Sequence, residues 1–195
     1  IAHETVYGGV PRAGDTLAME IRIDSCEDDA VAYQGRCRIG GSTVLELRDC
    51  VGPMLPLSDF DDPDDMRAFY ELLRTSGAPV DRFPGLAVVP LAPLAHQPGL
   101  SASARLDVPH DAPFFADHFP RRPVFPGTLL LDRMTTLAAG VAREAAAGRE
   151  VFVRRVIDVK LRAFIEPGAA LTLHAAVEPA GFRVDAIAGD VLRRF

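Results

Sequence analysis

One stretch of the sequence combines residue types suited to moving protons beside a polarised carbonyl group. It reads Asp117-His-Phe-Pro-Arg-Arg-Pro-Val-Phe-Pro-Gly-Thr-Leu-Leu-Leu-Asp132. His118 lies in a proline-stiffened loop, and an imidazole titrates near neutral pH, so it is a candidate general base. Asp132 follows within an apolar run, where we expect a poorly solvated carboxyl group with a raised pKa that can donate a proton.

Gly127 follows Pro126 at the point where a long apolar helix is expected to begin. The first backbone N–H groups of a helix lack intrahelical partners and lie at its positive end, so they can stabilise a developing oxyanion. Each feature also has a purely structural interpretation. His118 could be a surface histidine, Asp132 a hydrogen-bonded polar group in a core, and Pro126-Gly127 a pair of the kind that commonly precedes a helix. Their combination in this order favours an active site.

The elements that must position these groups are a helix and an antiparallel sheet. Apolar residues cover most of the circumference of a helix predicted over 128–147, with Gly148 as its C′ residue. Such a helix has to be buried on nearly all sides, which a sheet wrapped around it achieves. Strands for that sheet are predicted at four places: 100–108, 151–165, 170–177 and 182–195.

The N-terminal half predicts an antiparallel meander and a short helix. Polarity alternates over 16–24, 31–39 and 43–48. Asp62 is the predicted N-cap and Pro63 the first residue of a helix that ends before Gly77. A weak internal repeat relates the turns and strands after Val10 to those after Ile165.

The resulting domain prediction has three parts. Residues 1–78 form a partial, non-catalytic N-terminal unit of strands plus the helix, 79–99 a proline-rich linker, and 100–195 the catalytic unit. The formal net charge of −6 argues against general nucleic-acid binding. The prolines that interrupt the apolar stretch 83–104 argue against a membrane span. Three cysteines without CxxC spacing, and no signal peptide, predict reduced thiols in a cytoplasmic protein.

The pattern H-F-P-x-x-P-x-x-P-G-x-L-x-x-D over 118–132 resembles the active-site signature of β-hydroxyacyl-acyl-carrier-protein dehydratases. Asp132 at the acid position looks more like the β-hydroxydecanoyl branch, whereas Asp117 stands where the family usually has Gly or Cys. The resemblance implies an α+β hotdog fold, an antiparallel sheet wrapped around a long central helix. Leu45-Glu-Leu-Arg-Asp-Cys-Val-Gly resembles the non-catalytic hotdog of double-hotdog domains in polyunsaturated-fatty-acid and polyketide synthases. Since the chain starts at Ile1 and not at Met, we expect a piece of a longer polypeptide.

The resemblance also implies a mechanism on a 3-hydroxyacyl chain carried by the phosphopantetheine of an acyl carrier protein. His118 would remove the α-proton, the Gly127 N–H would polarise the thioester carbonyl, and Asp132 would protonate the leaving hydroxyl. The product is a 2-enoyl thioester, and no metal or redox cofactor is required. Acyl-tunnel lining or plain core packing is the expected role of five residues: Phe115, Phe119, Val124, Phe125 and Pro126.

In this family the histidine and the acid of one site commonly come from two hotdogs that face each other. A homodimer or pseudo-dimer is therefore implied, in which His118 pairs with Asp132 of a second chain or with an acid of the missing part of the first hotdog. Two other functions stay open: a hotdog thioesterase that activates water with Asp132, and a non-catalytic module that binds acyl carrier proteins. Release of free thiol without an enoyl product would favour the thioesterase.

Overall fold

The computed structural model describes residues 1–77, 87–116, 118–147 and 149–188. The chain divides into two compact units, and neither is a continuous stretch of sequence. Unit 1 consists of Ile1–Leu55 and Phe152–Ala163, and unit 2 of Pro56–Val151 and Phe164–Phe195. This division differs from the predicted boundaries, which lie at 78/79 and 99/100.

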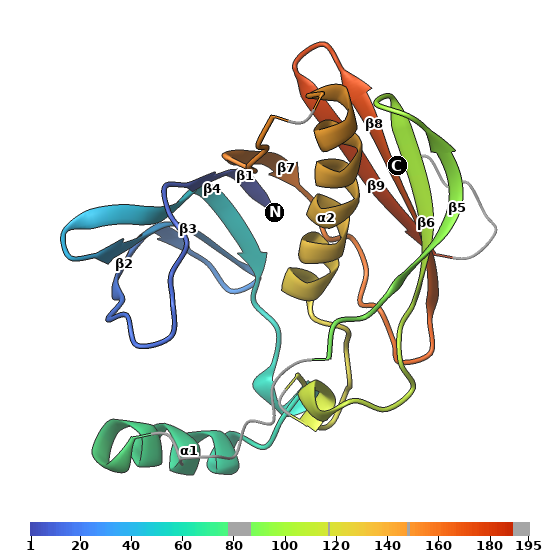
Figure 1. Cartoon of the computed structure of the whole chain (residues 1–195). Helices are drawn as coiled ribbons and strands as arrows, with labels where there is room; N and C mark the ends of the chain where they lie inside the picture. The colour runs from blue at the N-terminus through green and yellow to red at the C-terminus, as the bar shows by residue number, and fades with distance from the viewer. Residues whose placement is uncertain (78–86, 117, 148, 189–195) are drawn as a thin grey trace. The chain divides into compact units, whose positions relative to one another are not determined.

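Unit 1 is a five-stranded antiparallel sheet with the order β2-β3-β4-β1-β7 (Figure 1). Its strands are β1 (Ala2–Tyr7), β2 (Ala18–Cys26), β3 (Ala30–Ile39), β4 (Ser42–Pro53) and β7 (Arg155–Val159). The meander β2-β3-β4 confirms the prediction from alternating polarity. Strand β1 was not predicted, and it pairs on one side with β4 (Ala2↔Cys50) and on the other with β7 (Ala2↔Val159).

Unit 2 is built from a four-stranded antiparallel sheet, β5-β6-β8-β9, packed on the long helix α2 (Figure 1). Its elements are η1 (Leu57–Asp59), α1 (Pro63–Ser76), β5 (Leu91–Gln97), β6 (Ser101–Asp107), η2 (Pro113–Ala116), α2 (Gly127–Ala145), β8 (Ala170–Glu178) and β9 (Gly181–Ala188). Helix α2 contacts β6, β8 and β9. This is the hotdog arrangement, so the predicted α+β class is confirmed.

The core of unit 2 lies between the sheet and the helix. Leu106 and Leu173 are fully buried on adjacent strands, and Leu130 of α2 joins the same cluster. Burying a Leu or Phe side chain stabilises a fold by roughly 1.5–3 kcal/mol. The remaining buried members of this cluster are Val108, Phe114, Phe115, Phe125 and Leu171.

Two predicted elements of the C-terminal half differ from the structure. The strand predicted over 151–165 is limited to β7, which pairs with β1 in unit 1 and not with the sheet around α2. The linker predicted over 79–99 contains β5, an edge strand that pairs with β6; residues 78–86 lie outside the described part of the chain. Pro93 suits an edge strand, because a proline has no N–H to donate to the ladder.

The helix starts follow the predicted chemistry. Asp62 caps α1 by accepting hydrogen bonds from the backbone N–H groups of Asp64 and Asp65, and Pro63 is the first helical residue. Helix α2 begins at Gly127, one residue before the predicted start, and the predicted C′ residue Gly148 lies outside the described residues. Among the described helices, none is both long enough and apolar enough to span a membrane.

Candidate active site

His118 lies in a short loop that closes on itself. We call residues 118–124 the His118 loop. The backbone N–H of Val124 donates to the carbonyl of His118 (3.0 Å), and the N–H of Arg122 donates to the carbonyl of Phe119 (3.1 Å). The loop is anchored to η2, because the N–H of His118 donates to the carbonyl of Phe114 (3.0 Å), a buried core residue. These bonds fix the backbone on both sides of the imidazole.

The hydrogen bonding of the imidazole decides which nitrogen is available for chemistry. His118 Nδ1 lies 3.0 Å from the carbonyl oxygen of Val124. A carbonyl oxygen can only accept, so Nδ1 carries the proton in this bond, and the neutral ring keeps its lone pair on Nε2. The half-buried ring also stacks on Phe119, with centroids 4.3 Å apart and an interplanar angle of 27°. In the neutral ring, Nε2 is therefore the nitrogen that can accept a proton.

Gly127 starts α2 three residues after the loop ends. The carbonyl of Pro126 accepts from the N–H groups of Leu129 (3.0 Å) and Leu130 (3.1 Å), which closes the first helical turn. The chain just before it is fixed to the core, because the N–H of Phe125 donates to the carbonyl of Ile165 (2.7 Å). The Gly127 N–H thus lies at the positive end of a helix of 19 residues, as predicted.

Asp132 has surroundings other than those predicted. Its side chain is 58% exposed and accepts from the Nε of the neighbouring Arg133 (3.0 Å). The expectation of a poorly solvated carboxyl group is wrong, because α2 packs on its sheet along one face and its opposite face is exposed. That exposed face carries Thr128, Asp132 and Thr136. Asp132 as the catalytic acid stays a prediction.

The five predicted tunnel residues fall into two groups. Phe115 and Phe125 belong to the buried cluster of unit 2, where core packing describes them. Val124, the last residue of the loop, and Pro126 are also buried, on either side of Phe125. Phe119 is half-buried, and its ring lies between those of His118 and Phe60. Its side chain contacts the imidazole, which Val124 contacts through its backbone carbonyl.

Sequence reasoning missed residues that contact the His118 loop from an earlier part of unit 2. The carbonyl of Phe60 accepts from the N–H of Arg121 (3.0 Å), and the Arg121 guanidinium pairs with Asp62 (2.6 Å). Arg122 lies over the ring of Phe164, 4.8 Å from its centroid. Asp62 was predicted only as the N-cap of α1, without a contact to the His118 loop. The Arg-Arg pair inside the loop was the available signal that a carboxylate partner lies close by.

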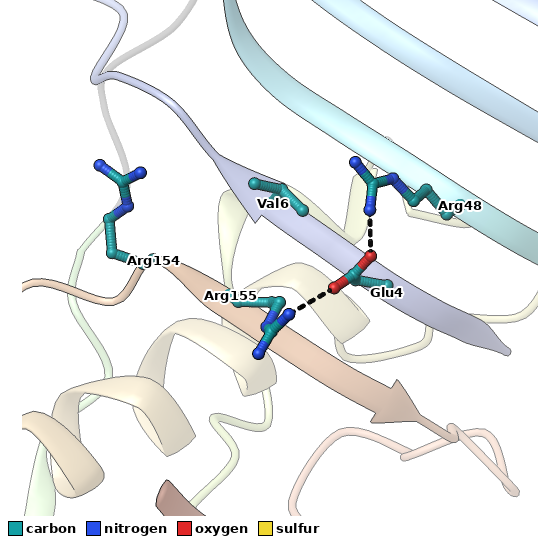
Figure 2. Close-up of a pocket in the computed structure, with 5 residues that line it drawn as sticks. All are labelled: Glu4, Val6, Arg48, Arg154 and Arg155. Atoms are coloured by element: carbon teal, nitrogen blue, oxygen red, sulfur yellow. Dashed lines mark hydrogen bonds and ion pairs between the residues drawn. The ribbon is translucent and has the colours of Figure 1, made fainter. Parts of the chain in front are cut away.

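Unit 1 contains an open surface pocket of about 370 Å³, which Figure 2 shows. Glu4 lies between Arg48 (2.5 Å) and Arg155 (3.2 Å), and Val6 and Arg154 complete the lining. Burial acts to raise the pKa of Glu4, but hydrogen bonds and charges of the two arginines outweigh it, so the pKa is lowered. The network links β4, β1 and β7, which identifies it as a structural ion-pair cluster within unit 1.

Comparison with known proteins agrees with the geometry of unit 2. Residues 95–190 match the family model described as ApeI-like, the ApeI dehydratase. The chain is 32% identical over 100 residues to the 3-hydroxyacyl-[acyl-carrier-protein] dehydratase FabZ of Rickettsia bellii, covering 50% of this chain and 68% of that protein. It is also 32% identical over 84 residues to the FabZ of Rickettsia africae, where 42% of this chain and 58% of that protein are covered.

A solved structure, the dehydratase domain of the polyketide PpsC from Mycobacterium tuberculosis, aligns with 96% of this chain and 72% of its own chain, at 17% identity and a TM-score of 0.44. The similarity to the FabZ of Rickettsia bellii, at 32% identity, extends over 68% of that protein's length and shows the family. The chain belongs to the family of 3-hydroxyacyl-[acyl-carrier-protein] dehydratases.

Proposed function

We propose that this chain removes water from a 3-hydroxyacyl thioester to give a 2-enoyl thioester. The observation that carries the proposal is the bond from His118 Nδ1–H to the Val124 carbonyl, which leaves Nε2 as the base in a loop three residues before the start of α2. His118 removes the α-proton, while the N–H of Gly127 stabilises the oxyanion that forms on the thioester carbonyl. The C–O bond to the β-carbon then breaks, and the hydroxyl leaves as water.

The leaving hydroxyl needs a proton, which Asp132 supplies in this proposal. An exposed Asp132 fits a site that is completed by a second hotdog, since the second copy would cover the exposed face of α2 and desolvate the carboxyl group. We therefore propose a homodimer in which His118 and Asp132 of one site come from different copies. The alternative is a pseudo-dimer in which His118 pairs with an acid of a first hotdog. The chemistry moves two protons and no electrons, so it needs neither a metal nor a redox cofactor.

The substrate in this proposal is carried by an acyl carrier protein, which is the partner named for the FabZ relatives. A cytoplasmic location is proposed with it, in agreement with the free thiols of Cys26, Cys37 and Cys50. The pathway that this activity serves is fatty-acid or polyketide synthesis.

The test is a turnover assay with a 3-hydroxyacyl thioester, in which the ultraviolet absorbance of the conjugated enoyl product and the release of free thiol are followed together. We expect enoyl product without free thiol, and a loss of about 10²–10⁴-fold in kcat for His118→Ala. The matched control is His96→Ala, an exposed histidine of unit 2 that pairs with Glu144. Free thiol without enoyl product would instead identify a thioesterase, and carrier binding without any product a non-catalytic module.

The origin of the acid is tested by mixing two inactive variants. If His118 and Asp132 act across two copies, co-expression of His118→Ala with Asp132→Asn restores about a quarter of the wild-type activity, because mixed dimers have one intact site. Each variant alone stays inactive. Activity that never recovers on mixing, with mixed dimers present, would place both groups in one copy.

A further inference from the structure

Residues 57–62, which we call the brace, contact the His118 loop at three points through Arg121. The backbone N–H of Arg121 donates to the Phe60 carbonyl (3.0 Å), and its guanidinium donates to the Ser58 carbonyl (3.1 Å) and to the carboxylate of Asp62 (2.6 Å). Arg121 lies in the middle of the loop, three residues after His118. The brace therefore holds the middle of the loop from outside, in addition to the hydrogen bonds within the loop.

An aromatic contact continues from the brace to the imidazole. Phe60 is 7% exposed, and its ring lies edge-on to Phe119 with centroids 5.2 Å apart. Phe119 in turn stacks on His118 at 4.3 Å. Phe164 (5.5 Å) and the guanidinium of Arg122 (5.5 Å) pack against the Phe60 ring as well. The ring of Phe119 is thus in contact with both the Phe60 ring and the His118 imidazole.

The two carboxylate oxygens of Asp62 accept hydrogen bonds from different partners. Oδ1 accepts from the N–H groups of Asp64 and Asp65 and caps α1, while Oδ2 pairs with Arg121. The two backbone hydrogen bonds, followed by the charge of Arg121, lower the pKa of Asp62. Because the two oxygens have separate partners, the cap and the ion pair can be separated by mutation.

We propose that Phe60 and the Asp62–Arg121 pair are positioning residues for His118. This inference rests on the proposed function, in which His118 Nε2 removes a proton. Phe60 limits the tilt of the imidazole through Phe119, and the ion pair holds the loop so that the Val124 carbonyl stays within reach of Nδ1. Displacement of a catalytic group by about 1 Å can lower a rate by about 10²-fold, so a distant brace of this kind has a measurable effect on turnover.

Two substitutions test the brace, each with a matched control on α1. Asp62→Asn keeps an N-cap acceptor of similar strength but removes the charge that pairs with Arg121. Its control is Asp64→Asn, which removes an exposed carboxylate that pairs with Arg67. Phe60→Leu replaces the buried ring with a smaller aliphatic side chain, and its control is Phe69→Leu, a half-exposed phenylalanine of α1.

The readouts are kcat and KM on a 3-hydroxyacyl thioester, and the NMR signals of the His118 ring nitrogens in the full chain. We expect Asp62→Asn and Phe60→Leu to lower kcat by about tenfold to a hundredfold with little change in KM. We also expect both variants to shift the Nδ1 signal of His118. In the two controls, Asp64→Asn and Phe69→Leu, kcat and the ring signals should match those of the wild type. Folded variants with wild-type kcat and wild-type ring signals would overturn the inference, and Asp62→Asn keeps the test open if Phe60→Leu does not fold.

The NMR readout separates this inference from the proposed function. If the wild-type chain shows no dehydration, the proposed function fails, and the ring signals alone then decide whether the brace positions His118. Shifted signals in the two variants support the brace, and unchanged signals overturn it.

Discussion

The two units contain similar antiparallel hairpins but differ in what covers them. In unit 2, α2 packs against β6 and β8, and Leu106 and Leu173 are fully buried. In unit 1, the described residues contain no helix, and Met19 and Ile21 on β2 are 76% and 58% exposed. Alternating polarity therefore forms the strands in both units, but the large buried cluster forms in unit 2, where the helix supplies a second apolar surface. The buried apolar side chains of unit 1 are Cys37, Val44 and Cys50.

Unit 1 carries ion pairs between its strands. Arg36 pairs with Glu20 across β2 and β3 (2.6 Å), and Glu4 joins Arg48 and Arg155 across three strands. Exposed ion pairs contribute little to stability. We therefore expect mutations of equal chemistry to have very different effects in the two units.

The largest difference is expected for truncation of a β-strand leucine or isoleucine. Leu173→Ala in unit 2 leaves a cavity and should lower the free energy of unfolding by about 2–5 kcal/mol. Ile21→Ala in unit 1 should change it by no more than about 0.5 kcal/mol, because the side chain is already exposed. Urea unfolding followed by circular dichroism measures both. Equal losses would show that β2 is buried in solution and would remove the contrast.

A smaller difference is expected at the hairpin turns. Gly181, the first residue of β9 after the turn from β8, has φ +146°, whereas Gly40, between β3 and β4, has φ +53°. Residues with a side chain reach the second value at modest cost, but the first lies outside the left-handed region that they adopt. Gly181→Ala should cost about 1–3 kcal/mol and Gly40→Ala about 1 kcal/mol in the same urea assay. A reversed order would contradict the turn geometries.

The smallest effect is expected for the ion pairs of unit 1, and it depends on pH. The folded pKa of Glu4 lies below its ordinary value of 4.5, so the unfolded chain binds more protons between the two values. The stabilisation is complete above pH 4.5 and is lost as the pH falls through the lowered pKa. Glu4→Gln should therefore lower the urea midpoint slightly near neutral pH, and this difference should shrink in acid. A difference that grew in acid would contradict the assignment.

Local sequence signals predicted much of this fold. Polarity alternation identified β2, β3 and β4, and the Asp62–Pro63 start identified α1. The long apolar run identified α2 to within a residue at its start. The loop that carries His118 and the helix start at Gly127 could be located in the same way, because both lie within one short stretch of sequence.

What could not be predicted depends on contacts between distant residues. The pairing of β7 with β1 joins Ala2 to Val159, and no local pattern indicates that partner. The exposure of Asp132 follows from which face of α2 the sheet covers, a property of the packing and not of the apolar run. The contact of Phe60 with the His118 loop likewise spans about sixty residues of chain.

The placement of β7 in unit 1 has a consequence for dissecting this protein. The backbone passes from one unit to the other at three points along its length, near Leu55, Val151 and Ala163. A fragment restricted to 100–195 would lack β5, leaving one edge of β6 without its partner, and would carry β7 with its hydrogen-bonding partner β1 removed. Both open edges invite self-association, so an isolated fragment of that kind should aggregate, and expression plasmids should encode both units together.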